Sequence, residues 1–225
     1  MPDIFDEISE DLRNDRAVGL AKRYGVWLLG ACVAVLVGVG AQQGWQGYQT
    51  RQANKAALQY LALTATVDLA NAPPAPAQAV QAAQSLNQFA ATAPEGYKTL
   101  ANLRAAALYA SAGQPTQAAA LWTGVAQDGS ADPLLRDLAN LLWAQHAVGT
   151  AADADVLARL QPLALDANPY HALARETQAL VYLHQGNNAQ AKALFTQIAT
   201  DPNAPGNVRN RAQALLASLN AGSNG

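Results

Sequence analysis

The sequence predicts an all-α protein in which a single N-terminal transmembrane helix is followed by an antiparallel array of helices. Three observations lead to this prediction. An almost purely apolar run extends from Tyr24 to Ala41. The rest of the chain is rich in Ala, Leu and Gln and poor in Val, Ile and Thr, which favours helices over strands. Turn-forming Gly, Pro and Asn residues recur there at intervals of roughly 11 to 20 residues, the length of ordinary helices.

Residues 1–23 form a polar leader with one apolar stripe. Ile4, Phe5, Ile8 and Leu12 recur with the spacing of a single helix face. Acidic residues come before the basic ones, so the charges of a helix here would complement its dipole. An amphipathic helix at the cytoplasmic surface and a disordered tail are both compatible with this pattern.

Residues 24–43 are predicted to span a membrane, because a bilayer core about 30 Å thick requires about 20 apolar residues in a helix. Four basic residues precede the run, with Lys22 and Arg23 adjoining it after Arg13 and Arg16, whereas only Arg51 and Lys55 lie close behind it. The side of the membrane with more basic residues is the cytoplasmic one. We therefore expect a cytoplasmic leader and a translocated C-terminal domain.

Three other interpretations of the apolar run are open. The residues Val39-Gly40-Ala41 form a tolerable cleavage site before Gln42, so the run could be a removed signal peptide, although the acidic leader is unlike the usual start of one. The residues before Cys32 loosely resemble a lipidation signal. The run could also be a buried core helix of a soluble protein.

Small residues share one face of the predicted span, where Gly30, Ala34 and Gly38 recur every four residues. Such residues let helix backbones approach closely in lipid. This face is therefore a predicted packing site for another membrane helix, with self-association as one possibility. The alternative is that Gly and Ala are simply frequent in membrane helices.

Charge and cysteine content restrict the function of residues 44–225. This part of the chain carries 10 basic and 10 acidic residues, so it has no excess positive charge for binding phosphates. We expect no nucleic-acid binding. The single cysteine, Cys32, lies in the apolar run, which leaves the rest of the chain without a thiol for a disulfide or a metal.

A helical stalk or first helix is expected over residues 44–71, and a repeat array over residues 72–225. Gly113 aligns with Gly186 at an offset of 73 residues, and Gly149 lies near the midpoint, which indicates units of about 36 residues. The middle unit is less regular, because Pro162 interrupts its second helix. The matching segments of the outer units are Ala106-x-x-Tyr109 with Ala179-x-x-Tyr182, Ala118-x-x-x-Trp122 with Ala191-x-x-x-Phe195, and the closing Pro133 with Pro202.

This order of small residue, aromatic residue, turn glycine and closing proline resembles the tetratricopeptide repeat; an accidental Ala-rich helical bundle is the alternative. The whole layout, with a leader beginning IFDEISEDLR and a closing segment ALFTQIATDPNAPGNVRNRAQALLASL, resembles the YfgM-type ancillary subunits of the SecYEG translocon. The resemblance implies a single-pass protein of a Gram-negative bacterial inner membrane, facing the periplasm. It also implies translocon subunits, periplasmic chaperones or exported chains as partners, and no catalytic residues.

The first helix of each unit is expected to line a concave surface with side chains three or four positions apart. An apolar groove with a few charges suits a peptide segment. Trp143 and Arg136 are the predicted anchors, since Trp and Arg dominate interface energetics. The leucines could instead be buried, and residues 45–71 could fill the groove. The predicted groove residues are Leu100, Leu103, Arg136, Trp143, His146, Leu173, Glu176 and Leu180.

No pattern in the sequence indicates catalysis. His146, His171 and His184 lack metal-binding spacing, and there is no glycine-rich phosphate loop. We expect a non-enzymatic scaffold without metal or cofactor that binds other proteins, associated with the Sec translocon and periplasmic chaperones. The alternative is an envelope-assembly or cell-division protein that uses the same repeats after signal cleavage. An enzyme would require a deep polar pocket with converging ionisable groups.

Overall fold

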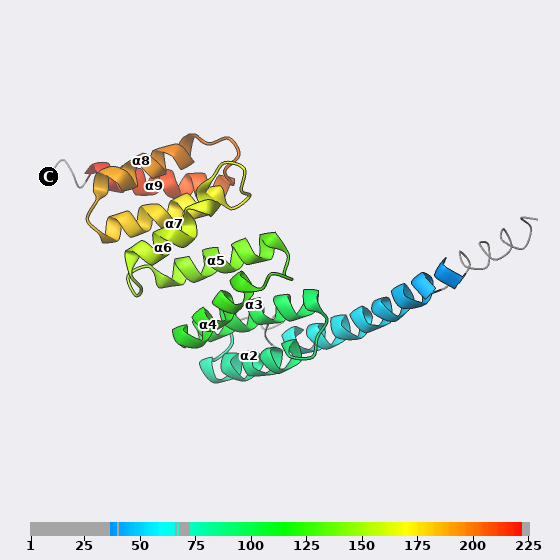
Figure 1. The fold of residues 1–225 in the computed structure, drawn as a ribbon. Coiled ribbons are helices and arrows are strands. Elements are labelled where there is room, and N and C mark those ends of the chain that lie inside the picture. Colours follow the sequence, from blue (N-terminus) through cyan, green and yellow to red (C-terminus); the bar gives the residue numbers. More distant parts are fainter. Residues whose placement is uncertain (1–36, 40, 66, 68–72, 222–225) are drawn as a thin grey trace, which may run out of the picture. The chain divides into compact units, whose positions relative to one another are not determined.

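The computed structural model describes residues 37–39, 41–65, 67 and 73–221, and every element within these ranges is helical. Residues 41–65 form one long helix (Figure 1). The elements after it are α2 (Pro76–Ala90), α3 (Glu95–Ser111), α4 (Pro115–Gln127), α5 (Pro133–Ala147), α6 (Asp153–Leu160), the short 3-10 helix η1 (Pro162–Ala164), α7 (His171–His184), α8 (Asn188–Thr200) and α9 (Gly206–Ala221).

Contacts divide the chain into two units, Met1–Asn54 and Lys55–Gly225. Within Met1–Asn54, residues 41–54 are helical, and nearly all of their side chains are exposed. Among the described helices, none combines the length and the apolar character that crossing a membrane requires.

Most of the predicted N-terminal features lie outside the described residues. This holds for the leader, for most of the predicted span over residues 24–43, and for Gly30 and Ala34 of the predicted packing face. Gly38 is described: it is exposed, and a side chain added there would meet no neighbouring atom. The membrane anchor therefore stays a prediction.

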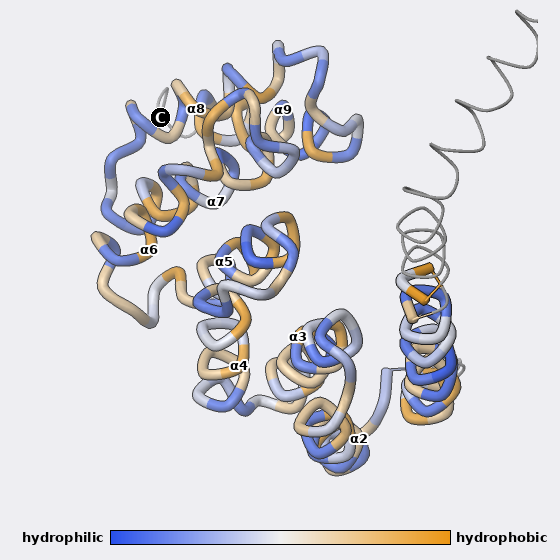
Figure 2. Tube along the Cα trace, turned by 45° about the vertical axis from the view of Figure 1, so that its right-hand side comes forward, coloured by the Kyte–Doolittle hydropathy of each residue, from blue (hydrophilic) through white to orange (hydrophobic). Residues whose placement is uncertain are grey.

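Within Lys55–Gly225, the helices form an array in which each helix from α2 to α9 packs against the next. The alternate helices α3, α5, α7 and α9 also contact one another in sequence. Figure 2 shows hydrophobic and hydrophilic positions alternating around these helices, as expected when each is buried on one side. We name the repeat units by their helix pairs: the first unit is α3–α4, the middle unit α5–α6 and the last unit α7–α8.

Three clusters of buried side chains hold the array together, and each is centred on one repeat unit. Trp122, Leu160 and Phe195 are their large, fully buried members on the second helices. The end of the first long helix belongs to this core, because Tyr60, Leu63 and Val67 pack against the first cluster. The buried alanines between the helices allow close approach, as the repeat pattern predicted.

Glycine ends the first helix of every unit in a left-handed conformation. Gly113, Gly149 and Gly186 have φ angles of 74°, 75° and 74°, and they are the only described residues with positive φ. Because only glycine adopts this conformation without strain, the repeat spacing predicted these turns correctly. In both outer units a backbone hydrogen bond to the carbonyl of a first-helix tyrosine closes the turn. It runs from Gln114 N–H to Tyr109 O (2.9 Å) and from Asn187 N–H to Tyr182 O (2.8 Å).

The turn of the middle unit is longer than the turns of the outer units. Residues 148–152 connect α5 to α6, whereas residues 112–114 and 185–187 connect the equivalent helices. The extra length moves the buried side of α6 by two positions, so that Ala154 and Ala158 are exposed. Val156, Leu160 and Leu163 take the buried places that Ala118, Trp122 and Val125 hold in the first unit and Ala191, Phe195 and Ile198 hold in the last.

Candidate protein-interaction surfaces

The eight predicted groove residues differ in how much surface they offer to a partner. Leu100 on α3 and Leu180 on α7 are 39% and 40% exposed, so both present apolar area to solvent. Leu103 is buried in the first core cluster, and Leu173 is half-buried against the second and third clusters. Leu103 therefore contributes to packing and offers almost no surface.

Arg136 is half-buried on α5, and its Nε is buried without a hydrogen-bond partner in the described part of the chain. A buried donor left unpaired costs roughly 1–3 kcal/mol. The position of Arg136 on a first helix is the one that the groove hypothesis requires, and the unpaired donor distinguishes it from the other predicted groove residues.

Trp143, the other predicted anchor, already has partners inside the molecule. Its ring packs between the first and second core clusters. The Arg159 guanidinium lies 3.8 Å from the ring centroid and donates to the Thr123 hydroxyl at 3.3 Å. Partial burial lowers the pKa of Arg159. Trp143 thus joins α5 to α4 and α6, and its ring face is covered by a cation of the same chain.

His146 and Glu176 also make intramolecular contacts. The exposed His146 ring stacks on the buried Trp122 ring with centroids 4.8 Å apart. The buried Glu176 carboxylate accepts two bonds from Arg211 of α9, at 2.8 Å and 2.6 Å. Glu176 therefore fastens the last helix to α7, because its carboxylate oxygens both have a partner.

A contact between a basic residue and an aspartate closes each outer unit at the end opposite to the glycine turn. In the first unit, Lys98 Nζ lies 2.9 Å from Asp128 Oδ2. In the last unit, His171 Nε2 lies 2.7 Å from Asp201 Oδ2. Each pair joins the beginning of the first helix to the residue after the second helix, and we call the two pairs the clamps.

Each clamp aspartate is held by a second set of bonds. Asp128 Oδ1 accepts from Ser130 N–H at 3.0 Å, and Asp201 Oδ1 accepts from Asn203 N–H at 2.8 Å. The Ser130 hydroxyl, followed by Lys98, lowers the pKa of Asp128 far below its ordinary value. The Asn203 N–H, followed by His171, lowers the pKa of Asp201. Both carboxylates are therefore stabilised in their charged form.

The clamps were not predicted from the sequence, although the repeat spacing contains a signal for them. The 73-residue offset that aligns the turn glycines also aligns Lys98 with His171 and Asp128 with Asp201. The middle unit breaks this pattern. Leu134 stands at the position of the basic residue, and Asp166 comes as far after the buried Leu163 of η1 as Asp128 and Asp201 come after Val125 and Ile198.

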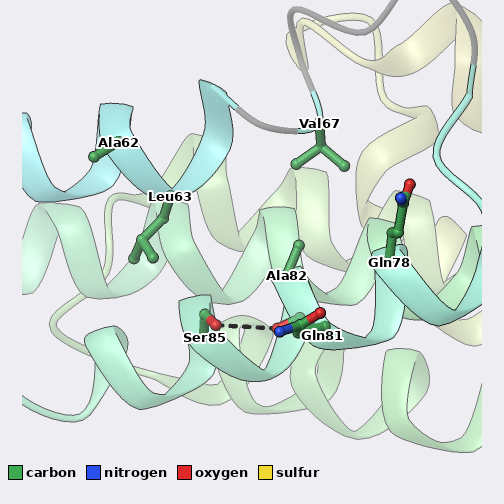
Figure 3. A pocket seen from close by; sticks show the side chains of 7 residues that line it. All are labelled: Ala62, Leu63, Val67, Gln78, Gln81, Ala82 and Ser85. Atoms are coloured by element: carbon green, nitrogen blue, oxygen red, sulfur yellow. Dashed lines mark hydrogen bonds between the residues drawn. The ribbon is translucent and has the colours of Figure 1, made fainter.

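Two cavities lie within the array, away from the predicted anchors. The larger, of about 370 Å³, separates the end of the first long helix from α2 (Figure 3). The described residues of its walls are apolar or neutral and polar, without an ionisable side chain among them. The other, of about 360 Å³, adjoins the first clamp beside Asn102. The larger cavity is lined by Ala62, Leu63, Val67, Gln78, Gln81, Ala82 and Ser85.

The described residues do not form a group of three or more His, Cys, Asp or Glu side chains that could hold a metal. The partly exposed helix faces are suited to contacts with another polypeptide. Helix pairs that stack with glycine turns and a shared core define a helical repeat scaffold.

The chain matches the family of tetratricopeptide repeat-like domains over residues 21–221, and it belongs to this family. No curated protein and no solved structure matches the chain. The fold and the family are those of a protein–protein interaction scaffold, a class that is typically non-enzymatic.

Proposed function

We propose that this protein is a membrane-anchored scaffold that binds other proteins on the periplasmic side of a bacterial inner membrane, together with the Sec translocon and periplasmic chaperones. The observation that carries the binding role is the repeat array itself, whose first helices leave Leu100 and Leu180 partly exposed and Arg136 with an unpaired donor. The apolar run and its basic flank support the anchor and its direction. The resemblance to YfgM-type subunits supports the translocon and the chaperones as partners.

The binding role is tested by crosslinking in intact cells. A photoreactive residue placed at Leu100 or at Leu180 is expected to capture translocon subunits, chaperones or exported chains. Ala120, an exposed residue of the second helix α4, is the matched control position. Equal capture from Ala120 and from the two leucines would show that the first helices form no specific binding surface.

The anchor is tested separately from binding. A reporter fused after Gly225 is expected to be active only when it is exported, and alkaline carbonate is expected to leave the protein in the membrane fraction. A mature N-terminus at Gln42, with release by carbonate, would instead favour the cleaved envelope-assembly or division-linked protein. An active cytoplasmic reporter would reverse the proposed orientation.

A further inference from the structure

The middle unit lacks the clamp that closes both neighbouring units. Lys98, Leu134 and His171 precede their turn glycines by the same number of residues, so Leu134 replaces the basic residue of the clamp. Leu134 is 48% exposed, and Leu165 beside the equivalent aspartate is 64% exposed. Exposed apolar side chains at a position that is polar in both other units do not serve the packing of the repeat.

Hydrogen bonds tie the segment that carries Leu165 to the helix that carries Leu134. The Asn168 side-chain amide donates to Asp137 Oδ2 of α5 at 2.8 Å, and Asn168 N–H donates to Leu165 O at 2.9 Å. The segment 165–168 therefore lies against the beginning of α5. Leu134 is one helical turn before Asp137 on the same helix face.

Three carboxylates lie at or beside the corner between segment 165–168 and α5, those of Asp132, Asp137 and Asp166, and Arg175 pairs with the last of them. Asp132 is exposed at the N-cap of α5, and its side chain accepts from Leu134 N–H at 2.8 Å. Burial raises the pKa of Tyr170, and the charges of Asp137 and Asp132 raise it further. A phosphate or an anionic lipid would be repelled here, whereas a cation would be attracted.

Asp166 is the carboxylate that a partner could use. Its side chain is 88% exposed, and its ion pair with Arg175 reaches only Oδ1. Because an ionised carboxylate accepts several hydrogen bonds, Asp166 keeps capacity for a second cation. In the outer units a basic side chain of the first helix contacts the equivalent aspartate, and in the middle unit Leu134 has no such group.

We propose that the corner formed by Leu134, Leu165, Asp132 and Asp166 docks a basic amphipathic segment of a partner protein. Aliphatic side chains of the segment pack on the two leucines, and its Lys or Arg side chains bind the aspartates. The partner thereby supplies the basic residue of the clamp that the middle unit lacks. This inference rests on the proposed protein-binding function and assigns to it a second surface, distinct from the predicted groove.

The test measures binding of labelled peptides to the purified full-length chain by fluorescence anisotropy. A leucine–lysine amphipathic peptide is expected to bind at least about tenfold more tightly than a leucine–glutamate or a serine–lysine peptide of the same pattern. Raising the salt concentration is expected to weaken its binding, because the charges are exposed. Equal binding of the leucine–lysine and leucine–glutamate peptides would overturn the proposal.

Variants locate the site. The double variant Leu134→Lys with Leu165→Ser is expected to weaken binding of the leucine–lysine peptide at least about tenfold, since it removes both apolar contacts and adds a repelling charge. Leu61→Lys, at another exposed leucine, is the control and is expected to bind as the unaltered chain does. Leu165→Ser alone repeats the test if the double variant unfolds. Unchanged binding by the corner variants would place the peptide elsewhere.

The outcome is separable from the proposed function. If the corner variants lose the peptide while crosslinks from Leu100 in cells persist, two surfaces act independently. If the corner variants bind the peptide normally and the crosslinks from Leu100 also persist, only the docking corner is rejected. If no crosslinks form from position 100 in a chain whose corner is unaltered, the groove is rejected and the peptide result is unaffected.

Discussion

The outer repeat units and the middle unit use the same helix pair but close it differently. The first and last units have short glycine turns, second helices of 13 residues, and clamps between a basic residue and an aspartate. The middle unit has a longer turn, a second helix of 8 residues continued by η1, and Leu134 where the clamp base would be. The middle unit is thus held mainly by its core, while its edge is available for another molecule.

The comparison also shows how a repeat tolerates irregularity. The long turn after Gly149 would expose the core if the register of α6 were unchanged. Instead Val156, Leu160 and Leu163 continue the buried side, and Leu163 reaches it from η1 after Pro162 ends the helix. What the array requires of each unit is a buried stripe of the right volume, and the sequence position of that stripe can move.

The largest expected effect tests this register. Leu160→Ala is expected to lower the free energy of unfolding by about 3 kcal/mol, because it leaves a cavity in a fully buried site. Ala158→Gln, at the position that strict repeat spacing would bury, is expected to change it by less than about 0.5 kcal/mol. Urea denaturation followed by circular dichroism measures both values. A large loss from the Ala158 variant would show that α6 is rotated.

The next largest effect on the free energy of unfolding is expected when equivalent aspartates of two units are replaced. Asp201→Ala is expected to lower the free energy of unfolding by about 2 kcal/mol, since it leaves the buried His171 ring and the Asn203 N–H without their acceptor. Asp166→Ala is expected to cost less than about 0.5 kcal/mol, because its carboxylate is almost wholly exposed. Similar losses in urea denaturation would mean that the middle and last units depend equally on this position.

Acid should weaken the clamps. A carboxyl group whose pKa is lower in the folded chain stabilises the fold above its unfolded pKa of about 3.9, and it loses this effect as pH falls through the folded pKa. Asp201 has such a lowered pKa, owing to the Asn203 N–H and then to His171. We expect the urea midpoint to decrease below about pH 4, and to decrease less steeply in Asp201→Asn. Identical pH profiles would remove Asp201 as a cause.

The smallest expected effect is a repair of the middle unit. Leu134→Lys places a cation where Lys98 and His171 stand, within reach of the aspartate position of its own unit. Because Asp166 is exposed and already pairs with Arg175, the expected gain in the free energy of unfolding is at most about 1 kcal/mol. Thermal unfolding measures it. A clear loss would indicate that Leu134 contributes apolar packing that its exposure does not reveal.

Sequence alone determined the features that depend on local chemistry. The helix content, the unit length and the three turn glycines followed from composition and spacing, because helix propensity and positive φ are properties of single residues and short segments. The membership in a repeat family followed for the same reason. The membrane-spanning run is also local, and it stays a prediction outside the described residues.

Tertiary structure decided which helix faces are covered and by what. Arg159 lies over the Trp143 ring, and Arg211 donates to the Glu176 carboxylate, and neither contact follows from the spacing that predicts both residues in the groove. The clamp in the last unit joins residues 30 positions apart. Such contacts depend on how the units stack, and stacking depends on the summed burial of many side chains, which no short segment of sequence contains.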